Sequence, residues 1–141
     1  MKQFNFNLEK ILKLKKYYED EAKIELGRAV SVLTDLENKI AVLGTEQARA
    51  AGSQFNPEND ISTIQQYTFY LQRLENIKEI LIKDAAMAEI KVEEARDLYM
   101  EASRERKVLD KVKEKRQKEN RKHIFSEETK ILDDVKRIKV F

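Results

Sequence analysis

Apolar residues recur at alternating three- and four-residue steps along two long segments of this chain, and no other feature constrains the fold as strongly. In the first segment only Lys15 and Glu19 interrupt the repeat. A seven-residue repeat is typical of a helix that packs along its whole length against another helix. The repeat residues of this segment are Leu8, Leu12, Ala22, Leu26, Ala29, Leu33, Leu36, Ile40 and Leu43.

The second segment carries a more regular repeat, in which only Lys78 and Arg106 are polar. Its other positions are Ile64, Tyr67, Leu71, Leu74, Leu81, Ala85, Ala88, Val92, Ala95, Tyr99, Ala102 and Leu109. For these residues, tyrosines included, helical spacing indicates a packing seam and implies no cofactor.

Between the two segments lies a stretch in which Gly44, Gly52 and Pro57 collect. Asn59, Asp60 or Ser62 suits the start of a new helix, with Ser62 and Gln65 in capping-box spacing. A short connection makes consecutive helices neighbours. The sequence therefore predicts one all-α domain, an antiparallel coiled-coil hairpin of two long helices at about 5–50 and 61–139, with a loop at about 51–60.

This hairpin has a definite predicted register, because a turn near residue 55 pairs residues whose numbers sum to about 110. Leu43 is then expected near Tyr67, Leu26 near residues 81–85, and Leu8 near Ala102.

Composition agrees with an extended helical protein. Charged residues make up 38% of the 141, there are three glycines and one proline, and cysteine is absent. Without cysteine the chain has no disulfide or thiolate site, which fits a reducing cytoplasm. Apolar runs are much shorter than a membrane span needs, and Met1 and Lys2 are not followed by the apolar core of a signal peptide. We expect a soluble, unexported protein.

The second helix is expected to be longer than the first and to overhang it. The apolar seam of the second helix stops at residues 105–110, which lie beside the start of the first helix in the predicted register. About thirty residues of the second helix, or roughly 45 Å, remain beyond this point. The stretch Arg104–His123 has ten Lys and Arg against four Asp and Glu, so it is strongly basic while the whole chain carries only +2. Its candidate partner-binding residues are Lys111, Lys115, Arg116, Lys118, Arg121 and Lys122.

Two apolar features lack a partner in the predicted hairpin. Beyond the basic stretch, Ile124 and Phe125 begin an amphipathic stripe that continues through Ile131, Leu132, Val135, Ile138 and Val140. Phe69 and Tyr70 fall at outer positions of the heptad, so at least Phe69 should point away from the partner helix. We interpret both features as candidate contact surfaces, with Ile131, Leu132, Val135 and Ile138 as the terminal contact residues.

Nothing in the sequence indicates catalysis. His123 has no nucleophile or second ligand beside it, and three scattered glycines cannot form a phosphate-binding loop. We expect no enzymatic activity, metal or cofactor.

Three blocks of the sequence are distinctive in their order and spacing. The first block, near the N-terminus, reads FNFNLEKILKLKKYYEDEAKIEL; the second reads ISTIQQYTFYLQRLENIKEI; the third, a basic run followed by a Leu-Asp-Asp step, reads VLDKVKEKRQKENRKHIFSEETKILDDVKR. These blocks resemble the FliJ family, the coiled-coil stalk and chaperone-escort proteins of the bacterial flagellar type III export apparatus. The three blocks stand in the family's order, and the resemblance spans nearly the whole chain, from Phe4 to Arg137.

The resemblance implies a function in flagellum biogenesis, motility and chemotaxis. Such a stalk inserts both chain ends in the hexameric ring of the export ATPase, promotes its assembly and activity, links it to the cytoplasmic domain of the membrane-embedded export gate, and escorts export chaperones. It would lie in the cytoplasm, peripheral to the inner membrane at the flagellar base. The loop end offers no clear match to the family's gate-contact residues, so Phe69 and Tyr70 stand on their exposure alone.

Two other classes of protein fit the residues. A nucleic-acid-binding hairpin would place the basic stretch on phosphates, but stacking aromatics are missing there and Glu114 and Glu119 interrupt it, so no nucleic acid is expected. A scaffold that self-associates through the terminal stripe is the other class. The basic surface also suits anionic lipid as a secondary property.

Overall fold

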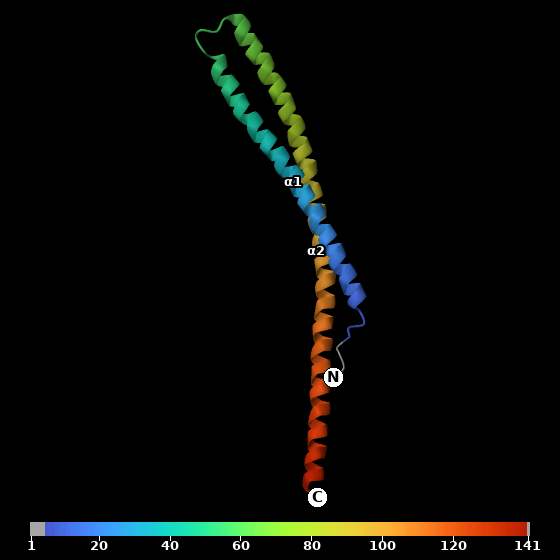
Figure 1. Ribbon diagram of the computed structural model, residues 1–141. Coiled ribbons are helices and arrows are strands. Elements are labelled where there is room, and N and C mark those ends of the chain that lie inside the picture. The colour runs from blue at the N-terminus through green and yellow to red at the C-terminus, as the bar shows by residue number, and fades with distance from the viewer. Residues whose placement is uncertain (1–4, 141) are drawn as a thin grey trace. The chain divides into compact units, whose positions relative to one another are not determined.

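The computed structural model describes residues 5–140, with the backbone alone for 139 and 140. It contains two helices, α1 (Glu9–Gln54, 46 residues) and α2 (Ile61–Val140, 80 residues), and no strand in the described range. Their order and their connection at one tip can be followed in Figure 1. The prediction of an all-α hairpin with a longer second helix is confirmed.

The first helix lies four residues later in the chain than predicted, at both ends. Gly44 and Gly52 were expected in the turn, but both lie inside α1 with helical backbone. The turn is therefore only residues 55–60. Glycine weakens a helix by about 1 kcal/mol relative to alanine but does not end it, and the packing of the neighbouring seam residues outweighs that cost.

Polar side chains cap both helices at the turn. The Asn59 side-chain amide donates to the carbonyl oxygens of Ser53 (2.7 Å) and Gln54 (3.2 Å) at the end of α1. The Asp60 carboxylate accepts from the Thr63 backbone N–H at 2.8 Å, which makes Asp60 the cap of α2. The Thr63 side chain, together with this backbone contact, holds the pKa of Asp60 below its usual range. Of the three residues predicted as possible N-caps of α2, Asn59, Asp60 and Ser62, it is Asp60 that caps the helix, and Ser62 lies inside it.

The helices form two compact units along the chain. Unit 1 combines residues 1–21 with residues 100–141, and unit 2 comprises residues 22–99. Within each unit the α1 segment packs against the α2 segment in antiparallel orientation (Figure 1).

The seam follows the heptad positions. The repeat residues of both helices are half-buried or buried, except Ile64, whose side chain is 39% exposed. A two-helix seam is thin, so few side chains are fully covered; the buried hydrophobic residues are Phe6, Leu12, Ala50, Leu74, Ala88 and Val92.

The predicted register is wrong by about ten residues. Glu46 contacts Tyr70 and Gln47 contacts Glu75 in unit 2, and Glu9 contacts Lys113 in unit 1, so paired numbers sum to about 120 rather than 110. Each residue by which the centre of the turn moves along the chain raises this sum by two. The turn at residues 55–60 is centred two to three residues later than assumed, which accounts for about half of the difference.

The three predicted pairs change accordingly. Leu43 borders a hollow with Leu81 rather than lying at Tyr67. The stretch around Leu26 lies beside residues 88–98 rather than 81–85. The start of α1 lies beside Lys113 rather than Ala102.

Candidate partner-binding surfaces

Two of the polar residues that interrupt the heptads, Glu19 and Arg106, contact each other in unit 1. Arg106 donates from Nε to Glu19 (3.0 Å) and from Nη1 to Asp110 (2.6 Å). Lys15 pairs with Glu105 at 2.9 Å. The carboxylates of Asp110 and Glu19 raise the pKa of Arg106, which stays charged within the seam. This seam is therefore held partly by ion pairs, where that of unit 2 is largely apolar.

Pairing in unit 1 reaches further along α2 than predicted. Lys113 Nζ pairs with Glu9 at 2.9 Å, a contact that lowers the pKa of Glu9, and the Arg116 guanidinium lies 5.6 Å from the centre of the Phe6 ring. The first part of the basic stretch therefore lies alongside the N-terminal segment and does not overhang it. The prediction that pairing ends at residues 105–110 is wrong, because the register is shifted.

All six predicted basic contact residues are nevertheless exposed. Lys111, Lys115, Arg121 and Lys122 reach solvent, while Arg116 also covers Phe6 and Lys118 forms an ion pair with Glu114 at 3.6 Å within α2. The sequence of unit 1 contains nineteen Lys and Arg against thirteen Asp and Glu, and that of unit 2 nine against thirteen. Positive charge is thus concentrated in the unit that contains both chain ends.

The predicted terminal stripe is uncovered from Phe125 to Ile138, whereas Ile124 at its start is half-buried and the Val140 side chain lies outside the described residues. From Phe125 to Ile138 every side chain of α2 is exposed, over about 20 Å of helix. The four predicted contact residues, Ile131, Leu132, Val135 and Ile138, have between 44% and 74% of their surface in solvent, and Phe125 has 72%. An apolar row of this length on a lone helix is unusual for a soluble surface and suits a binding partner.

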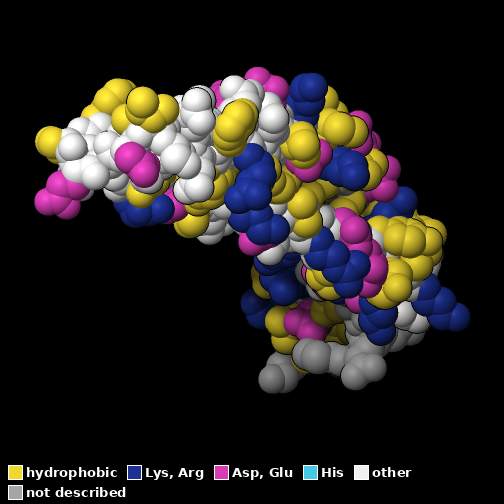
Figure 2. Space-filling model, turned by 90° about the horizontal axis from the view of Figure 1, so that it is seen from above, with side chains coloured by type: hydrophobic (Ala, Val, Ile, Leu, Met, Phe, Trp, Pro, Cys, Tyr) yellow, Lys and Arg dark blue, Asp and Glu magenta, His cyan; other side chains and the backbone are white. Residues whose placement is uncertain are grey.

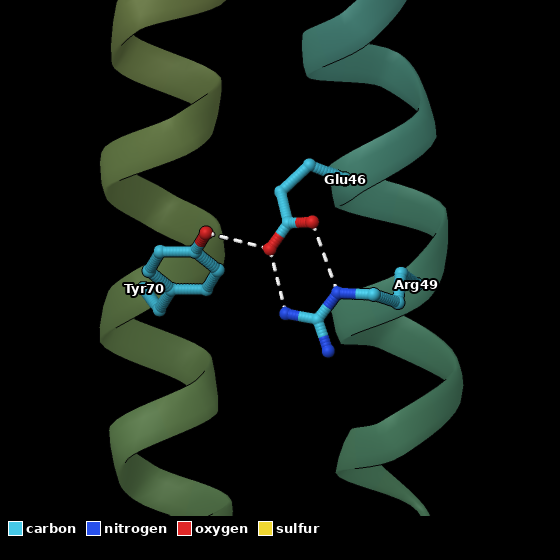
Figure 3. Close-up of polar contacts among 3 residues, drawn as sticks. All are labelled: Glu46, Arg49 and Tyr70. Atoms are coloured by element: carbon cyan, nitrogen blue, oxygen red, sulfur yellow. Dashed lines mark hydrogen bonds and ion pairs between the residues drawn. The ribbon is translucent and has the colours of Figure 1, made fainter.

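Near the turn, Phe69 and Tyr70 have different environments. Phe69 is 74% exposed, as expected. The Tyr70 hydroxyl is tied to α1, where it donates to a carboxylate oxygen of Glu46 at 2.7 Å, and Arg49 binds both oxygens of the same carboxylate (Figure 3). These contacts hold the pKa of Glu46 at about 2, chiefly through Arg49, and the same carboxylate raises the pKa of Tyr70.

This arrangement presents an aromatic surface on a fixed support. Arg73 lies over the Tyr70 ring at 5.5 Å, and Gln66, Phe69, Tyr70 and Arg73 border a shallow hollow of about 340 Å³. Sequence reasoning missed Glu46 and Arg49, because a register with sums near 110 places Glu46 far from Tyr70. It also missed Phe55 in the turn, which is 80% exposed.

The described residues contain no group of three or more His, Asp or Glu side chains placed to hold a metal ion. Neither helix, over the part of the chain that the structure describes, has a stretch apolar enough to cross a bilayer. Hydrophobic side chains do reach the surface in many places on the face seen in Figure 2, between charged ones. What the arrangement offers chemically is surface for binding.

Comparison with known proteins gives one match. A family model described as "Flagellar FliJ protein" matches residues 4–141. No curated protein and no solved structure matches the chain.

Proposed function

Because this chain belongs to the FliJ family, whose members are components of the flagellar protein export apparatus, we propose that it acts as the stalk of the export ATPase. In this proposal unit 1 enters the central opening of the hexameric ATPase ring, promotes its assembly and raises its activity. The chain contributes no catalytic group of its own.

One observation carries this proposal: unit 1 combines a basic stretch and a bare apolar stripe on consecutive lengths of α2. Exposed lysines and arginines from Lys111 to Lys122 attract an acidic surface over a distance set by screening. The stripe from Phe125 to Ile138 then supplies the apolar area that holds the docked state. A helix end that only needed to be soluble would not expose this row.

We assign the gate contact to the aromatic surface at the turn. Phe69 supplies an exposed ring, and Tyr70, braced by Glu46, gives that surface a fixed shape. Fixed aromatic side chains lose little entropy on binding and are frequent at the centres of interfaces. A stalk with one docking surface at the chain ends and another at the turn links the ring to the cytoplasmic domain of the gate, at the inner face of the membrane, and escorts export chaperones.

The ring-docking proposal is tested by charge reversal in the exposed basic stretch. Lys115→Glu, Arg121→Glu and Lys122→Glu together should abolish most stimulation of the partner ATPase, with the largest loss at low salt where screening is weakest. Helicity and melting should change little, because exposed charges contribute only about 0–1 kcal/mol each. Circular dichroism checks folding.

The matched control reverses the same amount of charge at three exposed lysines of α1, Lys13, Lys16 and Lys23, and should do much less. Truncation after His123 removes the terminal stripe and should weaken docking further. If both the charge-reversed and the truncated chains stimulate the ATPase normally, the basic stretch and the terminal stripe are only a solvated helix end. A salt-sensitive shift of nucleic acid at physiological ionic strength would instead favour the nucleic-acid-binding alternative.

A further inference from the structure

A groove runs along one face of unit 2, and it shares no residue with either surface discussed above. It consists of two hollows, of about 410 and 360 Å³, that share Val32, Ala88 and Lys91 and so form one continuous depression. We call it the shaft groove. Its α1 side consists of Glu25, Arg28, Ala29, Val32, Asp35 and Leu36, and its α2 side of Asp84, Met87, Ala88, Lys91, Glu94, Ala95 and Leu98.

The depth of the groove follows from the sequence. Alanine occupies the seam at positions 29, 88 and 95, so the floor lacks the bulk that leucine would supply. The walls carry large apolar side chains that face solvent, with Val32 56%, Met87 62% and Leu98 68% exposed. An alanine floor between apolar walls leaves room for a further set of side chains.

The dimensions suit one more helix. The α2 residues of the groove recur every three or four positions from Asp84 to Leu98, so they occupy one face over about 21 Å. The groove between two packed helices accepts the side-chain ridge of a third, whose apolar residues at three- and four-residue steps enter the hollows. An extended strand would leave its own backbone groups unpaired against these helix surfaces.

Charge around the groove indicates which helix fits. Four carboxylates border it, Glu25, Asp35, Asp84 and Glu94, against the two cations Arg28 and Lys91. Asp35 pairs with Lys39 and Glu25 with Arg28 within α1. Among the described residues, no ion pair involves Asp84 or Glu94. The α2 rim therefore has two carboxylates available to a basic ligand, and unit 2 as a whole carries an excess of negative charge.

We propose that the shaft groove binds an amphipathic helix of a partner protein, with aliphatic residues along one stripe and Lys or Arg beside it facing Asp84 and Glu94. The helix packs its stripe over the alanine floor and completes a three-helix arrangement in unit 2. This interaction goes beyond the proposed stalk function and uses none of its docking residues.

The experiment titrates the full-length chain with two synthetic helix-forming peptides of about 20 residues, long enough for a stable helix. Both carry leucine at heptad positions, and one has lysine at the flanking positions where the other has glutamate. Isothermal titration calorimetry should give binding of the lysine peptide at least about tenfold tighter than of the glutamate peptide.

Variants then locate the site. Val32→Asp with Leu98→Asp should weaken lysine-peptide binding by about tenfold or more. The matched controls Val30→Asp and Ile82→Asp change exposed aliphatic residues elsewhere on the two helices of unit 2 and should bind like the wild type. Asp84→Lys with Glu94→Lys should reverse the preference, so that the glutamate peptide binds better; loss of folding cannot produce this result.

Equal binding of both peptides, or equal losses from groove and control variants, would overturn the proposal. So would a chain that dimerises in analytical ultracentrifugation and becomes monomeric with Val32→Asp and Leu98→Asp, since the occupant would then be a second copy. Stimulation of the export ATPase by the groove variants should stay normal, which keeps this proposal and the ring-docking proposal separately testable.

Discussion

Leu12 is the side chain whose loss should separate the stability of unit 1 from that of unit 2. It is only 1% exposed, the most deeply buried large side chain among the described residues. Leu12→Ala removes three buried carbon groups at about 0.8 kcal/mol each, or about 2.4 kcal/mol in total. The additional cavity cost is small, because water reaches a two-helix seam from either side, so we expect unit 1 to lose about 2–3 kcal/mol.

The assay must resolve the two units, because a chain with two compact parts need not unfold in one step. Hydrogen exchange with mass spectrometry should show faster exchange in residues 9–21 and 100–116 and little change in residues 22–99. The matched control is the neighbouring Ile11→Ala. Ile11 is 44% exposed, so the same calculation gives a cost of about 1.3 kcal/mol, roughly half that of Leu12→Ala. Equal effects of the two substitutions, or a first response in residues 22–99, would refute the assignment of Leu12 to the core of a separate unit.

Three further predictions concern the helices. Gly27→Ala and Gly44→Ala should each raise stability by about 0.5–1 kcal/mol in chemical denaturation, since both lie in helix and an added Cβ meets no atom within 4 Å; a loss would mean that space is short. A double-mutant cycle of Glu19→Ala and Arg106→Ala should give a coupling of about 0.5–1.5 kcal/mol that shrinks in high salt, and additive effects would show that the pair adds nothing. Glu46, with its folded pKa lowered to about 2, contributes stability that is present above its ordinary pKa of 4.5 and is lost as pH falls towards 2. The advantage of the wild type over Glu46→Gln in thermal melts should therefore decline across that interval, and a constant difference would contradict the ion-pair origin.

Much of the fold is readable from spacing alone. The heptad residues from Leu8 to Leu43 and from Tyr67 to Leu109 are buried or half-buried in the structure, because a helix can hide a stripe only against a partner along its length. The exposure of Phe69 follows from its outer position in the repeat, and that of the stripe from Ile131 to Ile138 from the lack of a partner helix beside it. The periodicity of a helix depends only on residues three and four positions apart in the same segment, so it can be seen in the sequence.

The register of the two helices, in contrast, cannot be predicted from the repeat alone. Heptad seams can slide past each other by whole repeats with little change in pattern, and the turn selects one alignment. Here α1 continues through Gly44 and Gly52, a choice that depends on the packing of both helices and not on glycine content.

Everything that depends on cross-helix partners was therefore decided by tertiary structure. The sequence marks Lys15, Glu19 and Arg106 as breaks in the seam, but only the register brings Arg106 to Glu19 and Glu46 to Tyr70. The same alignment places Ala29 beside Ala88 and Ala95 and so opens the shaft groove. Periodicity tells each helix which face to bury, whereas the choice of which residues face each other is a property of the pair.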